Sequence, residues 1–170
     1  MMVIGYIGDH KGDGFRPWLG WALIRAAQVG RKYRAVTHTE ILIDGDCNAA
    51  DIASATMLDG GVVRIKTGVQ LNPAHWIVVD VPDTATRNVV LAAHWFFAHA
   101  GEKYDRRGAV GSVLYGIGQA EDEWFCNECC GTAMGQTDPH MNPPAGFIAW
   151  CFDMGGVDVT EEFFSRSARE

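Results

Sequence analysis

The stretch Trp124-Phe125-Cys126-Asn127-Glu128-Cys129-Cys130-Gly131 organises the rest of the chain. A cysteine here follows two aromatic residues and precedes a run of small ones, a pattern that indicates the first turn of a buried helix. The partial positive charge at a helix N-terminus stabilises a thiolate, the nucleophilic form of cysteine. Cys126 is therefore a candidate nucleophile, although free cysteines are also among the residues most often buried in protein cores.

The composition is that of one compact domain over residues 1–170, with 48% hydrophobic residues. The net charge of -7 and the pI of about 5.3 argue against general nucleic-acid binding. No stretch approaches the length of a membrane span, and the N-terminus lacks the pattern of a secretory signal. Five cysteines, three of them within residues 126–130, indicate reduced thiols and a cytoplasmic protein.

The spacing of apolar residues predicts an α+β protein. Short strands are expected over 2–7, 35–43, 47–57, 62–66 and 76–81, and helices over 17–29, over 86–100 and from Cys126 onward. Thr84 or Thr86 is the expected cap of the second helix. The strands are predicted to form an antiparallel meander of about four to six strands with the Cys126 helix on one face. The polar tail from Glu161 is expected to fray.

His38 is the candidate base for Cys126, because a thiol nucleophile needs a base that is usually held by a third polar group. His38 and Glu40 are two residues apart on one predicted strand, so their side chains share a face. From spacing alone, a core cysteine and an ordinary strand histidine remain the simpler interpretation.

The spacing Cys126-x-x-Cys129 has two other interpretations. A structural zinc site needs four ligands, for which Cys130 and His140 are the available partners. A redox pair is expected after a strand in a βαβ unit, whereas a meander precedes this one. Cys129 and Cys130 are most simply helix-packing residues, and no metal or organic cofactor is predicted.

Several short motifs together resemble the permuted papain-like hydrolases related to the NlpC-type cell-wall peptidases, in which the His strand comes first and the Cys helix last. Residues 37–43 resemble the His strand, and Gly101-Glu102-Lys103-Tyr104-Asp105 is similar to the family's Gly-x-x-Tyr-Asp turn. Phe125-Cys126-Asn127-Glu128 is similar to its aromatic-Cys-Ser-Glu helix start, with asparagine in place of serine. Asp59-Gly60-Gly61-Val62 resembles a turn of a phage-associated branch. The resemblance covers roughly residues 35–150.

The resemblance implies a papain-like α+β fold in circularly permuted order, with Cys126 as nucleophile and His38 as general base. It also implies that Tyr104 binds or positions substrate and that a polar residue after the His strand orients the histidine. Ser54 and Glu40 are equally good candidates for that third member, and Asp51 and Thr56 are further ones.

The function implied by the resemblance is hydrolysis of an amide bond, in a cell-wall peptide or a similar small amide or ester, through a thioester. One alternative is a catalytically inactive binding or accessory protein of the same fold. Another is a lipid-directed acyl hydrolase or transferase, with Trp18, Trp21 and Trp124 lining an apolar groove. A small peptide or amide is the expected partner, and the oligomeric state stays open. If the protein acts outside the cell that makes it, the expectation is phage encoding or delivery by other means.

Overall fold

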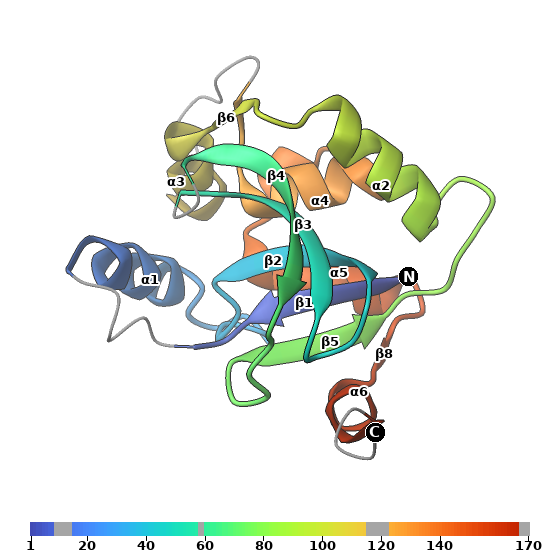
Figure 1. Cartoon of the computed structure of the whole chain (residues 1–170). Helices are drawn as coiled ribbons and strands as arrows, with labels where there is room; N and C mark the ends of the chain where they lie inside the picture. Colours follow the sequence, from blue (N-terminus) through green and yellow to red (C-terminus); the bar gives the residue numbers. More distant parts are fainter. Residues whose placement is uncertain (9–14, 58–59, 115–122, 167–170) are drawn as a thin grey trace.

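The computed structural model describes residues 1–8, 15–57, 60–114 and 123–166, with the backbone alone at 15–20, 110, 113 and 114. The chain is α+β, with four consecutive strands after the first helix and most of the other helices in the second half (Figure 1). In chain order the elements are β1 (Met2–Tyr6), α1 (Phe15–Ala27), β2 (His38–Asp44), β3 (Ala50–Thr56), β4 (Val62–Val69), β5 (Trp76–Asp80), α2 (Val89–Ala98), β6 (Lys103–Tyr104), α3 (Arg106–Leu114), β7 (Glu123–Trp124), α4 (Cys126–Ala133), the 3-10 turn η1 (Pro139–Met141), α5 (Pro144–Asp153), β8 (Val157–Asp158) and α6 (Thr160–Arg166).

The described strands form one curled sheet of eight strands in the order β7-β6-β4-β3-β2-β1-β5-β8. All neighbours are antiparallel except β6 and β7, which are parallel, so the sheet is mixed. The predicted count of four to six strands was too low, because β6, β7 and β8 are two residues long and carry no alternating pattern.

The predicted meander is wrong at its end, because β5 pairs with β1 and not with β4. Strand β1 lies inside the sheet between β2 and β5, where Ile4 is opposite Glu40 on one side and Val78 on the other. Alternation and composition identify a strand but not its partner. The long-range pairing of β1 was therefore beyond local sequence patterns.

Helix α4 packs against β2 and β3, with α2 and α5 beside it (Figure 1). Its Cys129 and Cys130 are fully buried in the main core. The other buried side chains of this core come from the sheet and from α2, α4 and α5, and they include Val3, Val36, Ile41, Ala53, Ala55, Val63, Val79, Phe96, Met134, Phe147 and Ile148. The predicted packing of the Cys126 helix on one face of the sheet is confirmed.

The second predicted helix begins at Val89 rather than Thr86, and neither Thr84 nor Thr86 caps it. Asn88 is the N-cap, and its Oδ1 accepts a hydrogen bond from the Leu91 N–H at 3.0 Å. Thr84 is instead in a turn, where its N–H donates to the Arg87 carbonyl oxygen at 2.7 Å. The backbone turn ending at Arg87 delays the start of the helix.

The C-terminal segment is ordered as α6 through Arg166, which corrects the predicted fraying from Glu161. Phe163 anchors this helix in a second core cluster with Leu42, Ile52 and Val78. Thr160 Oγ1 also accepts a hydrogen bond from the Val78 N–H at 2.8 Å. A single buried aromatic was too weak a pattern for sequence analysis to detect.

Gly60 and Gly61 adopt positive φ angles of 86° and 72° before β4 begins at Val62, whereas Asp59 of the same motif lies outside the described residues.

None of the helices in the described part of the chain combines the length and apolar character that crossing a membrane requires.

Candidate active site

Cys126 is the first residue of α4. Phe125 before it is extended, with φ −117° and ψ 167°, so the helix begins abruptly at the cysteine. The Glu128 carboxylate accepts a hydrogen bond from the Phe125 N–H at 3.4 Å. Because the first amides of a helix have no partner within it, the Cys126 N–H is a potential donor to a negatively charged oxygen.

Asn127 occupies the position where serine is more usual in the resembled family. Its Oδ1 lies 3.5 Å from Cys126 Sγ, and its Nδ2 donates to the Asn142 carbonyl oxygen. Asn127 is only 1% exposed. It thereby connects the thiol to the chain segment between η1 and α5.

The structure brings His38, the first residue of β2, to the Cys126 thiol. Burial opposes protonation of His38, but the charge of Cys126 and hydrogen bonds with Cys126 and Glu40 outweigh it and raise the pKa of His38 to about 10. His38 Nε2 lies 2.9 Å from Glu40 Oε1, which leaves Nδ1 as the nitrogen available to the thiol. An imidazolium next to a thiolate is the pairing that activates a cysteine nucleophile.

Of the four candidates for the third member, Glu40 has the hydrogen bond to His38. It is 3% exposed. Ser54 Oγ donates instead to the Thr39 carbonyl oxygen at 2.7 Å, and Asp51 Oδ1 accepts from the Gly68 N–H at 3.0 Å. Thr56 is buried near the end of β3. The geometry therefore favours Glu40 as the residue that orients His38.

Arg64 on β4 is a site residue that sequence analysis missed. Its Nη2 lies 3.1 Å from Glu40 Oε1, and its Nη1 lies 3.3 Å from Oε2. Burial alone would raise the pKa of Glu40, but hydrogen bonds to His38 and Arg64 and their charges lower it. The available signal was an arginine inside the apolar run Val62-Val63-Arg64-Ile65, where a buried charge needs a partner.

Tyr104 reaches the site through the parallel pairing of β6 and β7, in which Tyr104 is opposite Trp124. Burial raises the pKa of the Tyr104 phenol well above its ordinary value, and charge on Cys126 adds to the rise. The tyrosine hydroxyl therefore stays a hydrogen-bond donor near the thiol at neutral pH. Its predicted role in binding substrate stays a prediction.

A buried pair of acids supports the start of α4. Asp105 is fully buried, and its Oδ1 accepts from the Gly108 N–H at 2.7 Å. Burial and, to a lesser extent, the charge of Asp105 raise the pKa of Glu128 to about 7, although the hydrogen bond from Phe125 opposes the rise. Both residues belong to motifs of the sequence, Gly-x-x-Tyr-Asp and aromatic-Cys-x-Glu, but neither was predicted to act at the site.

The thiols of Cys129 and Cys130 contact backbone carbonyl oxygens. Cys129 Sγ donates to the Cys126 carbonyl oxygen at 3.0 Å, and Cys130 Sγ lies 3.6 Å from the Thr39 carbonyl oxygen. All five cysteines are free thiols. Among the described residues, no three histidine, cysteine or acidic side chains are placed to hold a metal ion, and His140 lies on η1.

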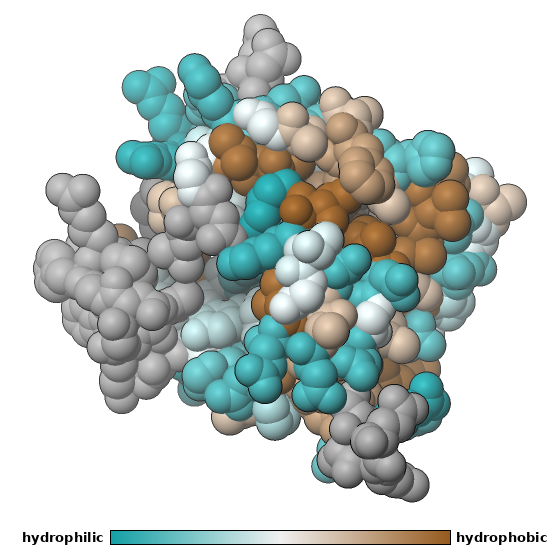
Figure 2. All heavy atoms as spheres, in the orientation of Figure 1, coloured by the Kyte–Doolittle hydropathy of each residue, from teal (hydrophilic) through white to brown (hydrophobic). Residues whose placement is uncertain are grey.

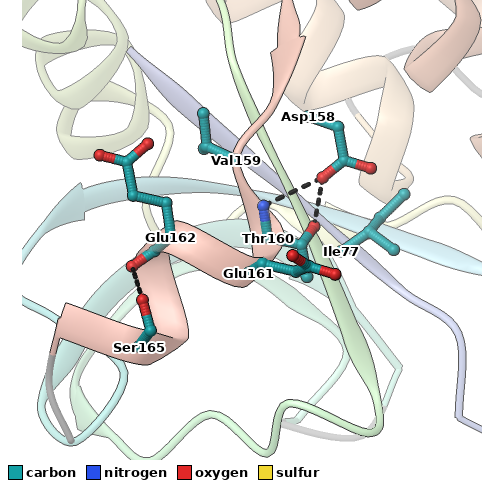
Figure 3. Close-up of a pocket in the computed structure, with 7 residues that line it drawn as sticks. All are labelled: Ile77, Asp158, Val159, Thr160, Glu161, Glu162 and Ser165. Carbon is teal, nitrogen blue, oxygen red and sulfur yellow. Dashed lines mark hydrogen bonds between the residues drawn. The ribbon is translucent and has the colours of Figure 1, made fainter.

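An open hollow of about 780 Å³ lies beside α6 (Figure 3). Its lining residues are Ile77, Asp158, Val159, Thr160, Glu161, Glu162 and Ser165, and none of them belongs to the Cys126 site. Figure 3 shows the acidic side chains of α6 and β8 around it, with Asp158 bonded to Thr160 and Ser165 to Glu162. The hollow therefore contributes nothing to the chemistry of Cys126.

The predicted aromatic groove has a different arrangement in the structure. Trp124 packs edge-on against Trp95, with ring centroids 4.9 Å apart, and donates its indole N–H to Glu102. Trp21 lies under the Arg25 guanidinium, 5.1 Å from the ring centroid, and the side chain of Trp18 lies outside the described residues. Trp124 thus packs against the core.

Comparison of the chain with protein-family models, curated proteins and solved structures yields no match.

Proposed function

We propose that this protein is a cysteine hydrolase of amide bonds with a papain-like fold in circularly permuted order. The observation that carries the proposal is the chain of contacts from Cys126 at a helix start, through His38, to the buried Glu40. The motifs that resemble NlpC-related hydrolases support the permuted assignment, because their order along the chain is His strand, Tyr-Asp turn and Cys helix.

In the first half of the reaction, the Cys126 thiolate attacks the carbonyl carbon of the amide. The C=O π electrons move onto oxygen, and the Cys126 N–H at the start of α4 donates to this oxyanion. Collapse of the tetrahedral adduct breaks the C–N bond. Protonated His38 gives its proton to the leaving amine, and a thioester to Cys126 remains.

In the second half, His38 is neutral and removes a proton from water as the water oxygen attacks the thioester carbonyl. The second tetrahedral adduct collapses with loss of the thiolate. The carboxylic acid product leaves, and the imidazolium–thiolate pair is restored. Glu40 keeps its hydrogen bond to Nε2 throughout, so the ring keeps one orientation for both proton transfers.

The substrate class follows from the resemblance and not from the geometry. NlpC-type enzymes cleave cell-wall peptides, so a short peptide from bacterial peptidoglycan is the first substrate class to test. Ester-linked analogues of the same acyl group are the second, because the thioester mechanism accepts either leaving group.

The pH dependence of iodoacetamide alkylation at Cys126 tests the proposal, read by mass spectrometry of each cysteine peptide. We expect the parent thiol to react at pH 6, and His38→Ala to slow this reaction sharply, because the imidazolium that stabilises the thiolate is lost. His94→Ala removes an exposed histidine of α2 and should leave the rate unchanged. Buried Cys47 and Cys151 serve as internal references.

A Cys126 that reacts only above pH 8 and ignores the His38 substitution would contradict the enzymatic proposal. The protein would then be a binding or accessory module of the same fold. The alkylation experiment needs no substrate, so it separates these two classes before any substrate screen.

One observation favours a lipid-directed acyl hydrolase or transferase as the second candidate. Val90, Leu91 and Phe97 of α2 are 62%, 44% and 70% exposed. Figure 2 shows apolar surface on the side of the molecule where α2 lies in Figure 1. Release of fatty acid from phospholipid vesicles, and its loss in Cys126→Ser, would support this candidate over a peptide hydrolase.

A further inference from the structure

Arg64 binds the carboxylate of Glu40 through both terminal nitrogens of its guanidinium. Nη2 is 3.1 Å from Oε1 and Nη1 is 3.3 Å from Oε2, a two-point contact. Arg64 is paired with Ser54 on β3, and Glu40 lies on β2 beyond it, so the guanidinium reaches across β3 to the His strand. The small side chain of Ser54 leaves room for this crossing.

We propose that Arg64 is a positioning residue for the Cys126 site, holding the Glu40 carboxylate so that Oε1 faces His38 Nε2. This proposal rests on the proposed function. Arg64 binds both carboxylate oxygens of Glu40, and we place its effect on Cys126 through Glu40 and His38.

The geometry explains why a second anchor is needed. A glutamate side chain rotates about its last carbon–carbon bond, and a hydrogen bond from His38 alone leaves this rotation free. A planar guanidinium bound to both oxygens fixes the plane of the carboxylate. Glu40 is 3% and Arg64 14% exposed, so little water competes for these contacts.

The charged groups around Glu40 come from three elements. His38 belongs to β2, Arg64 to β4, and Cys126 and Cys130 to α4. Burial and the charge of Cys126 raise the pKa of Tyr104 on β6, while the residue opposite Glu40 on β1 is the uncharged Ile4. Arg64 is thus the one cation besides His38 that shifts the pKa of Glu40 within the described part of the chain.

This arrangement predicts a specific pH effect. With Arg64 present, Glu40 stays ionised in acid and continues to stabilise the His38 imidazolium. Without Arg64, burial makes Glu40 bind a proton at higher pH, so His38 loses its anionic partner and the thiolate loses its imidazolium. The rate of Cys126 alkylation falls in acid as the thiolate is lost, and this part of the pH profile is its acid limb. The acid limb should therefore move to higher pH when Arg64 is removed.

The test compares alkylation of Cys126 against pH in the parent, Arg64→Met, Arg64→Lys, Glu40→Gln and the double variant. We expect Arg64→Met to shift the acid limb upward by about one pH unit. Its plateau rate should fall about 10-fold, the lower end of the cost of losing a partner that orients a functional histidine. Arg64→Lys keeps the positive charge but loses the planar guanidinium that binds both carboxylate oxygens. Its acid limb should therefore stay near that of the parent, while its maximal alkylation rate falls.

The double variant decides whether Arg64 acts through Glu40. If it does, Arg64→Met causes no further loss in the Glu40→Gln background. If Arg64→Met does not fold, the double variant and Arg64→Lys carry the test, because neither leaves the buried carboxylate charge without its cation. Lys66→Met removes an exposed cation from the same strand and should leave the profile unchanged.

Two results overturn the inference. If folded Arg64→Met has the same acid limb and the same maximal alkylation rate as the parent, Arg64 is dispensable, while the proposed function stands. Equal losses on Arg64→Met in the parent and Glu40→Gln backgrounds would show that it does not act through Glu40. A parent Cys126 that is unreactive below pH 8 would instead remove the proposed function, and the positioning role with it.

Discussion

Oε1 of Glu40 lies 2.9 Å from Nε2 of His38, two residues before it on strand β2. Both side chains leave the strand on the same side, as a two-residue spacing requires. The acid that orients the histidine thus comes from the same strand as the histidine itself. No third segment of the chain has to be brought in to complete the contact.

Glu40→Gln should lower the pKa of His38 from about 10, because the amide keeps a hydrogen-bond acceptor but removes the negative charge. A fall of at least about one pH unit is expected for loss of an opposite charge in contact. NMR titration of the His38 ring measures this directly. Ser54→Ala, which leaves Glu40 in place, should change the His38 pKa little; an equal fall there would make Ser54 the orienting residue.

Glu128→Gln should change how stability depends on pH. The pKa of Glu128 is raised from 4.5 to about 7 in the folded state, so the folded protein binds this proton more tightly than the unfolded chain. The free energy of unfolding should therefore fall as pH rises from 4.5 to 7, by up to roughly 3.5 kcal/mol at about 1.4 kcal/mol per unit.

Glutamine resembles the protonated acid and still offers an oxygen to the Phe125 N–H, so this loss should be absent in Glu128→Gln. Urea unfolding of parent and variant at pH 5 and pH 8 measures the difference. If the difference in free energy of unfolding between parent and variant is the same at pH 5 and pH 8, the prediction is contradicted.

Gln28→Ala should destabilise the fold by about 3 kcal/mol, because it leaves two buried backbone groups without partners. Gln28 is fully buried; its Nε2 donates to the Val36 carbonyl oxygen at 2.8 Å, and its Oε1 accepts from the Ala145 N–H at 2.8 Å. Thermal or urea unfolding measures the loss. Gln70→Ala, at an exposed position, is the matched control and should be nearly neutral.

Gly108→Ala should destabilise the protein although alanine is the better helix former. A Cβ at Gly108 would lie 2.2 Å from Asp105 Oδ2 and 3.1 Å from Phe125 Cδ1. The gain of about 1 kcal/mol in helix propensity is smaller than the cost of displacing a buried carboxylate. A variant with a higher melting temperature than the parent would show that Asp105 moves aside freely.

Most of the regular structure could be predicted from local patterns. Strands β1 to β5, helices α1 and α2 and the start of α4 at Cys126 are near their predicted places, because each shows the periodicity of its type over five or more residues. The two-residue strands and the Asn88 cap were missed. Each of them involves only one or two residues, which is too short for a periodic pattern to stand out from the adjoining turns.

The sequence by itself determined the α+β class, the helix start at Cys126 and the shared strand face of His38 and Glu40, since periodicity and local spacing govern all three. Only the tertiary structure placed β1 between β2 and β5, brought Cys126 to His38 across 88 residues of chain, and set Arg64 against Glu40. These are long-range contacts, decided by which strands pair and which side chains are buried together. Local residue patterns do not encode that choice.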